Sequence, residues 1–151
     1  MITAEQRTDP AETAAIAGLP KILDDKEIIA VSSSQIYSEV LEADLTDQQK
    51  ATFEAVTRRR SVVQIKDPTK DIQKLAGEIR SFYKKQGVKA PSGPDSVHLA
   101  TAIYYECDAF YTTDAKDKKD SCGLLKLTNP IAGKYVLTIS RPVAQQGGFP
   151  V

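Results

Sequence analysis

The sequence predicts an α/β domain in which a parallel sheet is flanked by helices. Short apolar runs alternate along the chain with longer stretches whose apolar residues recur every three or four positions. Capping residues or prolines stand where the longer stretches begin. Strands that alternate with helices pair in parallel, because the chain crosses back over the sheet between one strand and the next. The 151 residues are enough for one domain, with residues 1–8 and 144–151 expected to be loose termini.

The first part of the chain begins with a helix. Asp9 suits the N-cap and Pro10 the first helical position, and a break is expected near Pro20. Residues 28–31 are apolar and bounded by charge, which is typical of a buried strand, and the serines at 32–34 are expected to cap the next helix. Helices are then predicted over residues 35–42 and 46–60, where apolar side chains form one face.

The rest of the chain continues the alternation. Residues 62–65 form a second apolar run, and Asp67-Pro68 is expected to begin a long amphipathic helix that ends near Gly87. A helix over residues 94–103 leads into a third strand over 109–112. After a turn at Asn129-Pro130, residues 135–139 are expected to be the fourth strand.

The composition is that of an ordinary globular protein. Lys and Arg together number 20 and so do Asp and Glu, which disfavours a protein that binds DNA mainly through its phosphates. A nuclease whose acids are neutralised by a metal ion is compatible with this balance. Two cysteines and one histidine do not have the spacing of a zinc site. No apolar run approaches the ~20 residues of a membrane span, and no secretory signal is visible, so we expect a cytoplasmic protein.

Acidic residues fall where strands meet helices. Glu39 lies one turn into the helix after the first expected strand, and Asp95 opens the helix before the third. Asp114 ends that third strand, and Asp117 follows three residues later. Open α/β sheets place their sites at this edge. Acids brought together there repel one another unless a cation neutralises them, and Mg²⁺ prefers oxygen ligands.

Each of these residues also has a simpler interpretation. Taken alone, Asp95 is a helix-start carboxylate, Glu39 a surface residue, and Asp114 and Asp117 parts of a solvated turn. Their conjunction with the flanking apolar runs favours a shared site. His98 is expected to pack on its helix rather than act as a base.

A basic cluster, Arg58-Arg59-Arg60, stands at an expected helix end. Cations suit the helix dipole at that place, and contact with RNA phosphates is the functional alternative.

Three segments resemble the PIN-domain family, which includes the VapC-type toxins of bacterial toxin–antitoxin pairs. They are residues 33–41, 94–102 and 108–114, which hold Glu39, Asp95 and Asp114 in the family's order. The resemblance implies a PIN-like three-layer α/β domain and a metal-dependent endoribonuclease in which these three acids hold Mg²⁺ or Mn²⁺. It also implies that Asp117 assists from the neighbouring turn, and that Thr112 or Thr113 positions a water or another acid.

The same resemblance implies an RNA substrate, a cognate antitoxin and a homodimer. The chain departs from the family in one respect, because members begin with an apolar strand that ends in an Asp, and residues 1–8 are polar. We therefore expect either a chain whose upstream residues are missing or a degenerate member, in both cases prone to association. A catalytically inactive PIN-like module that binds RNA or protein is the main alternative. A flavodoxin-like domain is disfavoured, since no glycine-rich phosphate loop follows any expected strand.

Overall fold

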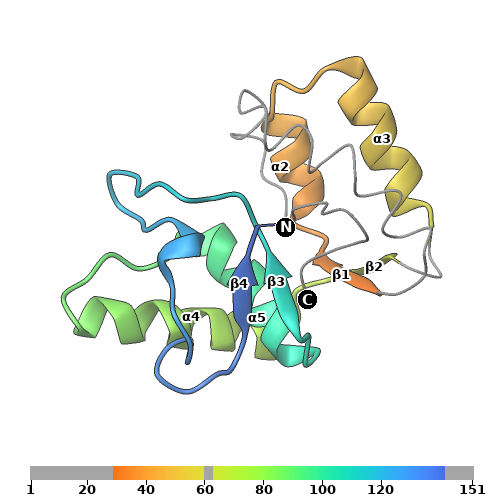
Figure 1. The fold of residues 1–151 in the computed structure, drawn as a ribbon. Helices are drawn as coiled ribbons and strands as arrows, with labels where there is room; N and C mark the ends of the chain where they lie inside the picture. The colour runs from red at the N-terminus through yellow and green to blue at the C-terminus, as the bar shows by residue number, and fades with distance from the viewer. Residues whose placement is uncertain (1–28, 60–62, 142–151) are drawn as a thin grey trace.

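The computed structural model describes residues 29–59 and 63–141 (Figure 1). The strands form two parallel pairs. β1 (Ala30–Ser33) pairs with β2 (Val63–Lys66), and β3 (Ala109–Tyr111) pairs with β4 (Thr138–Ser140). Four α-helices and a 3₁₀ turn complete the described part: α2 (Ile36–Glu42), α3 (Asp47–Thr57), α4 (Lys70–Lys85), α5 (Gly93–Tyr104) and η2 (Leu124–Lys126). The helix expected from Asp9 and both expected loose termini lie outside the described residues.

Helix α5 is the element that joins the two strand pairs. It packs along α4 and also contacts β1 and β3, while α3 packs on β2 (Figure 1). The predicted α/β class, with parallel strands between layers of helices, is confirmed. Within the described ranges, no helix is both long enough and apolar enough to cross a membrane.

The main hydrophobic core lies between α4, α5 and the β3–β4 pair. Helix α4 buries Ile72, Ala76 and Ile79, which are spaced four and three residues apart and so share one face. Helix α5 is buried on almost every side from Asp95 to Ala102. The loop after β3 adds large side chains to the same core, among them Leu124, Ile131 and Leu137. Each large aliphatic side chain buried there contributes about 1.5–3 kcal/mol.

Three hydroxyl groups at or within α5 form hydrogen bonds to the helix's own backbone, which lowers the cost of burying them. Ser92 is the N-cap, and its hydroxyl accepts from the backbone N–H of Asp95 at 3.2 Å. The Ser96 hydroxyl donates to the Ser92 carbonyl at 2.8 Å, and the Thr101 hydroxyl donates to the Val97 carbonyl at 2.7 Å. A polar group without such a partner would cost free energy at this depth.

Several expected boundaries were wrong. The helix expected over residues 46–60 ends at Thr57, with Arg58 as its C-cap. The first strand runs to Ser33, because Ser32 and Ser33 pair with β2 instead of capping the next helix. The long helix is capped by Thr69, two residues beyond the expected start at Asp67. The Thr69 hydroxyl accepts a hydrogen bond from the backbone N–H of Ile72.

The fourth strand also starts later than predicted. It begins at Thr138 rather than Tyr135. The Leu137 N–H donates to Asn129 Oδ1 at 2.8 Å, and Tyr135 forms an isolated antiparallel bridge with Ile131. The loop therefore uses the backbone groups that an earlier strand start would have required.

Candidate functional site

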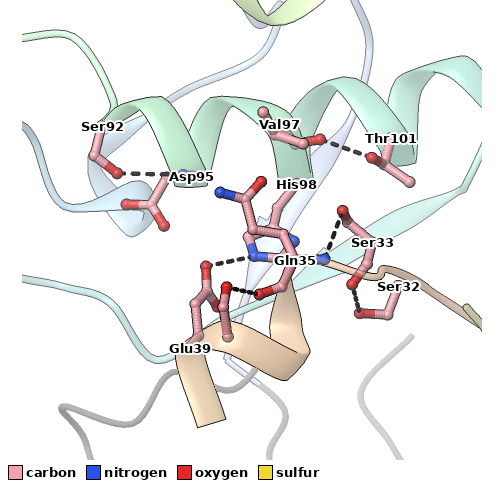
Figure 2. Close-up of polar contacts among 10 residues, drawn as sticks. Ser32, Ser33, Gln35, Glu39, Ser92, Asp95, Val97, His98 and Thr101 are labelled. Atoms are coloured by element: carbon pink, nitrogen blue, oxygen red, sulfur yellow. Dashed lines mark hydrogen bonds and ion pairs between the residues drawn. The ribbon is translucent and has the colours of Figure 1, made fainter. Parts of the chain in front are cut away.

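The structure places the three predicted acids on three different elements around α5. Glu39 projects from α2, just after β1, and Asp95 lies in the first turn of α5. Asp114 follows β3. Asp95 and Asp114 are 8% and 9% exposed, which is unusually low for carboxylates. Figure 2 shows the side chains of Glu39 and Asp95 in the space between α2 and α5.

The three acids influence one another electrostatically. Burial raises the pKa of Asp95 above its usual value, and the charges of Asp114 and Glu39 raise it further. A hydrogen bond from Ser92 and the proximity of His98 lower it in part. A buried acid that is surrounded by other acids favours its neutral form, and a bound cation would reverse that preference.

Asp114 is fixed by the chain on both sides of it. Its Oδ2 accepts from the backbone N–H of Leu124 at 3.2 Å, and its carbonyl accepts from the N–H of Leu125 at 2.9 Å. Its own N–H donates to Thr112 Oγ1 at 3.1 Å. Thr112 and Thr113 are both buried, and the Thr113 hydroxyl has no partner among the described residues. The threonine predicted to position an acid thus holds the backbone of Asp114.

Asp117 closes the loop that carries Asp114. Its Oδ1 accepts from the N–H of Gly123 at 3.0 Å and lies 3.2 Å from Lys126 Nζ. The Gly123 hydrogen bond, followed by Lys126, holds the pKa of Asp117 below its usual value. Asp117 is therefore bonded to the loop itself and stabilises the fold-back of residues 114–126.

The shortest contact at the site joins Glu39 to the chain's single histidine. Glu39 Oε1 lies 2.7 Å from His98 Nε2 (Figure 2). His98 is 2% exposed, and both Glu39 Oε2 and His98 Nδ1 are buried without a partner in the described part of the chain. This contact was not predicted from the sequence. The spacing of three between Asp95 and His98 puts both on one face of a helix, and that signal could have suggested it.

The structure does not bring the arginine cluster to the acids. Arg58 is highly exposed and lies 3.8 Å from Glu54, one turn earlier on α3. Arg58 is the C-cap of α3 and Arg59 lies just beyond the helix, while Arg60 lies outside the described residues. Arg58 and Arg59 precede β2, whereas Glu39 follows β1. Because β1 and β2 are parallel, the start of β2 and the end of β1 lie at opposite ends of the pair. An RNA contact by these arginines would therefore lie away from the acids.

The acids fit a hard divalent cation in type, although they do not enclose one. Among residues 29–59 and 63–141, no three His, Cys, Asp or Glu side chains converge on one ion position. Mg²⁺ does not need a closed protein cage, because it keeps several waters and binds through one or two carboxylates together with substrate phosphates. Glu39 Oε2, which is buried and has no hydrogen-bond partner among the described residues, is an oxygen of the type that such an ion prefers.

Comparison with known proteins gives one match. A sequence model described as "PIN domain" matches residues 10–119, which is most of the chain and includes all three acids. No curated protein and no solved structure matches the chain.

Proposed function

The chain belongs to the PIN-domain family, whose fold is of the nuclease type, and on that premise we propose that it is a metal-dependent endoribonuclease. The finer assignment within this proposal is the toxin of a VapC-type toxin–antitoxin pair. One observation supports the nuclease assignment above the others. Glu39, Asp95 and Asp114 come from separate elements and remain close enough for two of them to raise the pKa of the third.

Glu39, Asp95 and Asp114 would hold Mg²⁺ or Mn²⁺. When bound, the cation supplies charge stabilisation to the phosphodiester and activates water for its hydrolysis. The chain's own contribution is to keep the carboxylates in place before substrate arrives. Asp114 is held by Leu124 and Thr112, and Asp95 is confined by the burial of α5. Such preorganisation lowers the cost of reaching the reactive arrangement.

The proposed partners follow from the same assignment. RNA would be the substrate, an antitoxin would cover the acidic site, and two copies of the chain would form a homodimer in the cytoplasm. Asp117 would support the site through its loop, and Thr113 would offer its unpartnered hydroxyl to a water. Arg58, Arg59 and Arg60 would contact an RNA strand that extends away from the acids.

The test is cleavage of a mixed RNA pool by the purified chain with Mn²⁺, against EDTA. Metal-dependent cleavage is expected, and it should be lost in Asp95→Asn and in Asp114→Asn, which keep the side-chain shape and remove the charge. Asp71→Asn is the matched control, because Asp71 is an exposed residue in the first turn of α4. Cleavage that persists in both site variants would contradict the proposal.

A catalytically inactive PIN-like module is the second candidate. The observation that favours it is that the described acids do not form a group of three around one position. This candidate predicts RNA binding that is the same with Mn²⁺ and with EDTA, and no cleavage under either condition. The same RNA pool, with binding measured by filter retention, separates the two functions.

A further inference from the structure

In the described part of the chain, helix α2, which carries Glu39, makes few stabilising contacts, and one of them is the edge-to-face packing of Tyr37 against Phe53 of α3. Helix α2 is only seven residues long, its N-cap Gln35 makes no side-chain capping bond, and Ile36 is its one buried residue. Tyr37 and Leu41 on the same helix are 44% and 85% exposed. A Glu side chain loses substantial rotamer freedom when it is fixed in one position. On a weakly packed helix, beside two other acids, Glu39 would favour turning toward water.

Helix α5 is the opposite case. It is buried on nearly every side, and His98 lies in its middle with 2% of its surface exposed. The imidazole therefore has a fixed position relative to Asp95, one turn earlier on the same helix (Figure 2). In the described part of the chain, its contact with Glu39 is the hydrogen bond that ties α2 to α5.

We infer that His98 is the positioning residue of Glu39. A carboxylate has no proton to give, so His98 Nε2–H donates and Glu39 Oε1 accepts. This bond uses one carboxylate oxygen and leaves Oε2, which is buried and unpartnered, as the oxygen available to a cation. His98 thus sets both the position of the carboxylate and which of its oxygens would remain to hold the ion. The inference rests on the proposed metal-dependent function and adds a residue that acts through a ligand without touching the ion.

The first measurement tests the bond without any metal. Since His98 is the single histidine among 151 residues, a ¹⁵N-labelled chain without a histidine tag gives one set of imidazole nitrogen signals. We expect a protonated Nε2 whose proton exchanges slowly with water, because the ring is buried and hydrogen-bonded. Glu39→Gln should shift this signal, since a neutral amide replaces the carboxylate acceptor. A ring signal unchanged by Glu39→Gln would overturn the inference.

The second measurement tests the consequence for metal binding, by Mn²⁺ titration followed by calorimetry. His98→Met keeps similar side-chain length and volume and removes the donor, whereas His98→Gln retains an N–H at the corresponding position. Loss of a group that supports a metal ligand costs about 10–100-fold in metal affinity. We expect that loss in His98→Met and recovery of most of the affinity in His98→Gln. A role in packing alone would affect both variants alike.

The outcomes separate this inference from the proposed function. Wild-type protein that binds no Mn²⁺ would overturn the proposed function, and the imidazole spectrum would then decide whether His98 holds Glu39. Wild-type protein that binds Mn²⁺ with the same affinity as His98→Met would overturn the inference alone. Thermal unfolding of both His98 variants identifies any that fail to fold. In that case the inference is tested by comparing the imidazole ¹⁵N spectra of the wild type and of Glu39→Gln.

Discussion

A methyl group added at Gly123 should loosen the loop that holds Asp114. A Cβ at this position would lie 2.7 Å from the Ala115 carbonyl carbon, 2.7 Å from the Lys116 nitrogen and 2.9 Å from the Ala115 oxygen. All three atoms belong to the backbone, so no side-chain rotation can relieve the overlap. Because ordinary contact begins at 3.4 Å, the two sides of the loop must separate by about 0.7 Å. The backbone of Gly123 has a negative φ, so the effect of Gly123→Ala is steric and not conformational.

The expected loss of stability in Gly123→Ala follows from the steric overlap and from the hydrogen bonds that are stretched when the loop separates. Forcing an extra methyl group into a packed site costs about 1–3 kcal/mol. The same displacement pulls the N–H groups of Gly123 and Leu124 away from Asp117 and Asp114, to which they donate at 3.0 and 3.2 Å. For a chain of this length each kcal/mol lowers Tm by about 2–4 °C, so Gly123→Ala should lower Tm by about 2–12 °C.

Thermal unfolding followed by circular dichroism, with and without Mn²⁺, measures this cost. The matched control is Gly77→Ala, because Gly77 lies on the exposed side of α4 and a Cβ added there would meet no atom within 4 Å. Replacing a helical Gly by Ala stabilises by about 1 kcal/mol, so the control should raise Tm by about 2–4 °C. A Gly123→Ala protein as stable as wild type would refute the reasoning, as would Mn²⁺ affinity unchanged despite a lower Tm.

Two further predictions concern charge and packing. The pKa of Asp95 is raised, so the folded state binds its proton more tightly than the unfolded state, and this residue's contribution to stability falls as pH rises from 3.8 through the raised pKa. Asp95→Asn should therefore have a higher Tm than wild type at pH 7 in EDTA, with the difference vanishing toward pH 3.5; a lower Tm at pH 7 would contradict the sign. Ile79→Ala removes a fully buried side chain and should cost about 2–5 kcal/mol in urea unfolding, whereas Val136→Ala, at 82% exposure, should change stability by less than about 0.5 kcal/mol.

Much of the fold could be predicted from the sequence because its helices and strands have strong local signals. The apolar spacing of α4 and the Ser92 cap of α5 depend on residues a few positions apart. The boundaries that were wrong depend on contacts between distant residues. Ser33 extends a strand because Lys66 lies opposite it, and Leu137 stays out of the strand because Asn129 accepts from its N–H. Neither partner is marked by local spacing.

The proximity of the acids could also be predicted, for a topological reason, whereas their role as metal ligands stays a prediction. Functional residues of α/β folds gather at the carboxyl ends of parallel strands. Here β1 and β3 belong to separate strand pairs, and α5 contacts both of them. The structure brings Asp95 within the electrostatic influence of both Glu39 and Asp114, as that reasoning requires. What holds each acid in place could not be predicted, since Leu124 reaches Asp114 from ten positions along the chain and His98 reaches Glu39 from another helix.

The positions of the acids and the hydrogen bonds that hold them therefore have different origins, and this has a physical consequence for the site. The positions of its carboxylates follow from the order of the strands, but their orientation depends on hydrogen bonds from α5 and from the loop of residues 114–126. Changes at His98 or Gly123 should therefore weaken cation binding, because each disturbs a hydrogen bond to one of the carboxylates. The acids themselves should behave in the opposite way, since removing the charge of buried Asp95 relieves repulsion and stabilises the chain. Stability and cation affinity should move together for Gly123→Ala and in opposite directions for Asp95→Asn, which distinguishes a group that supports the site from one that forms it.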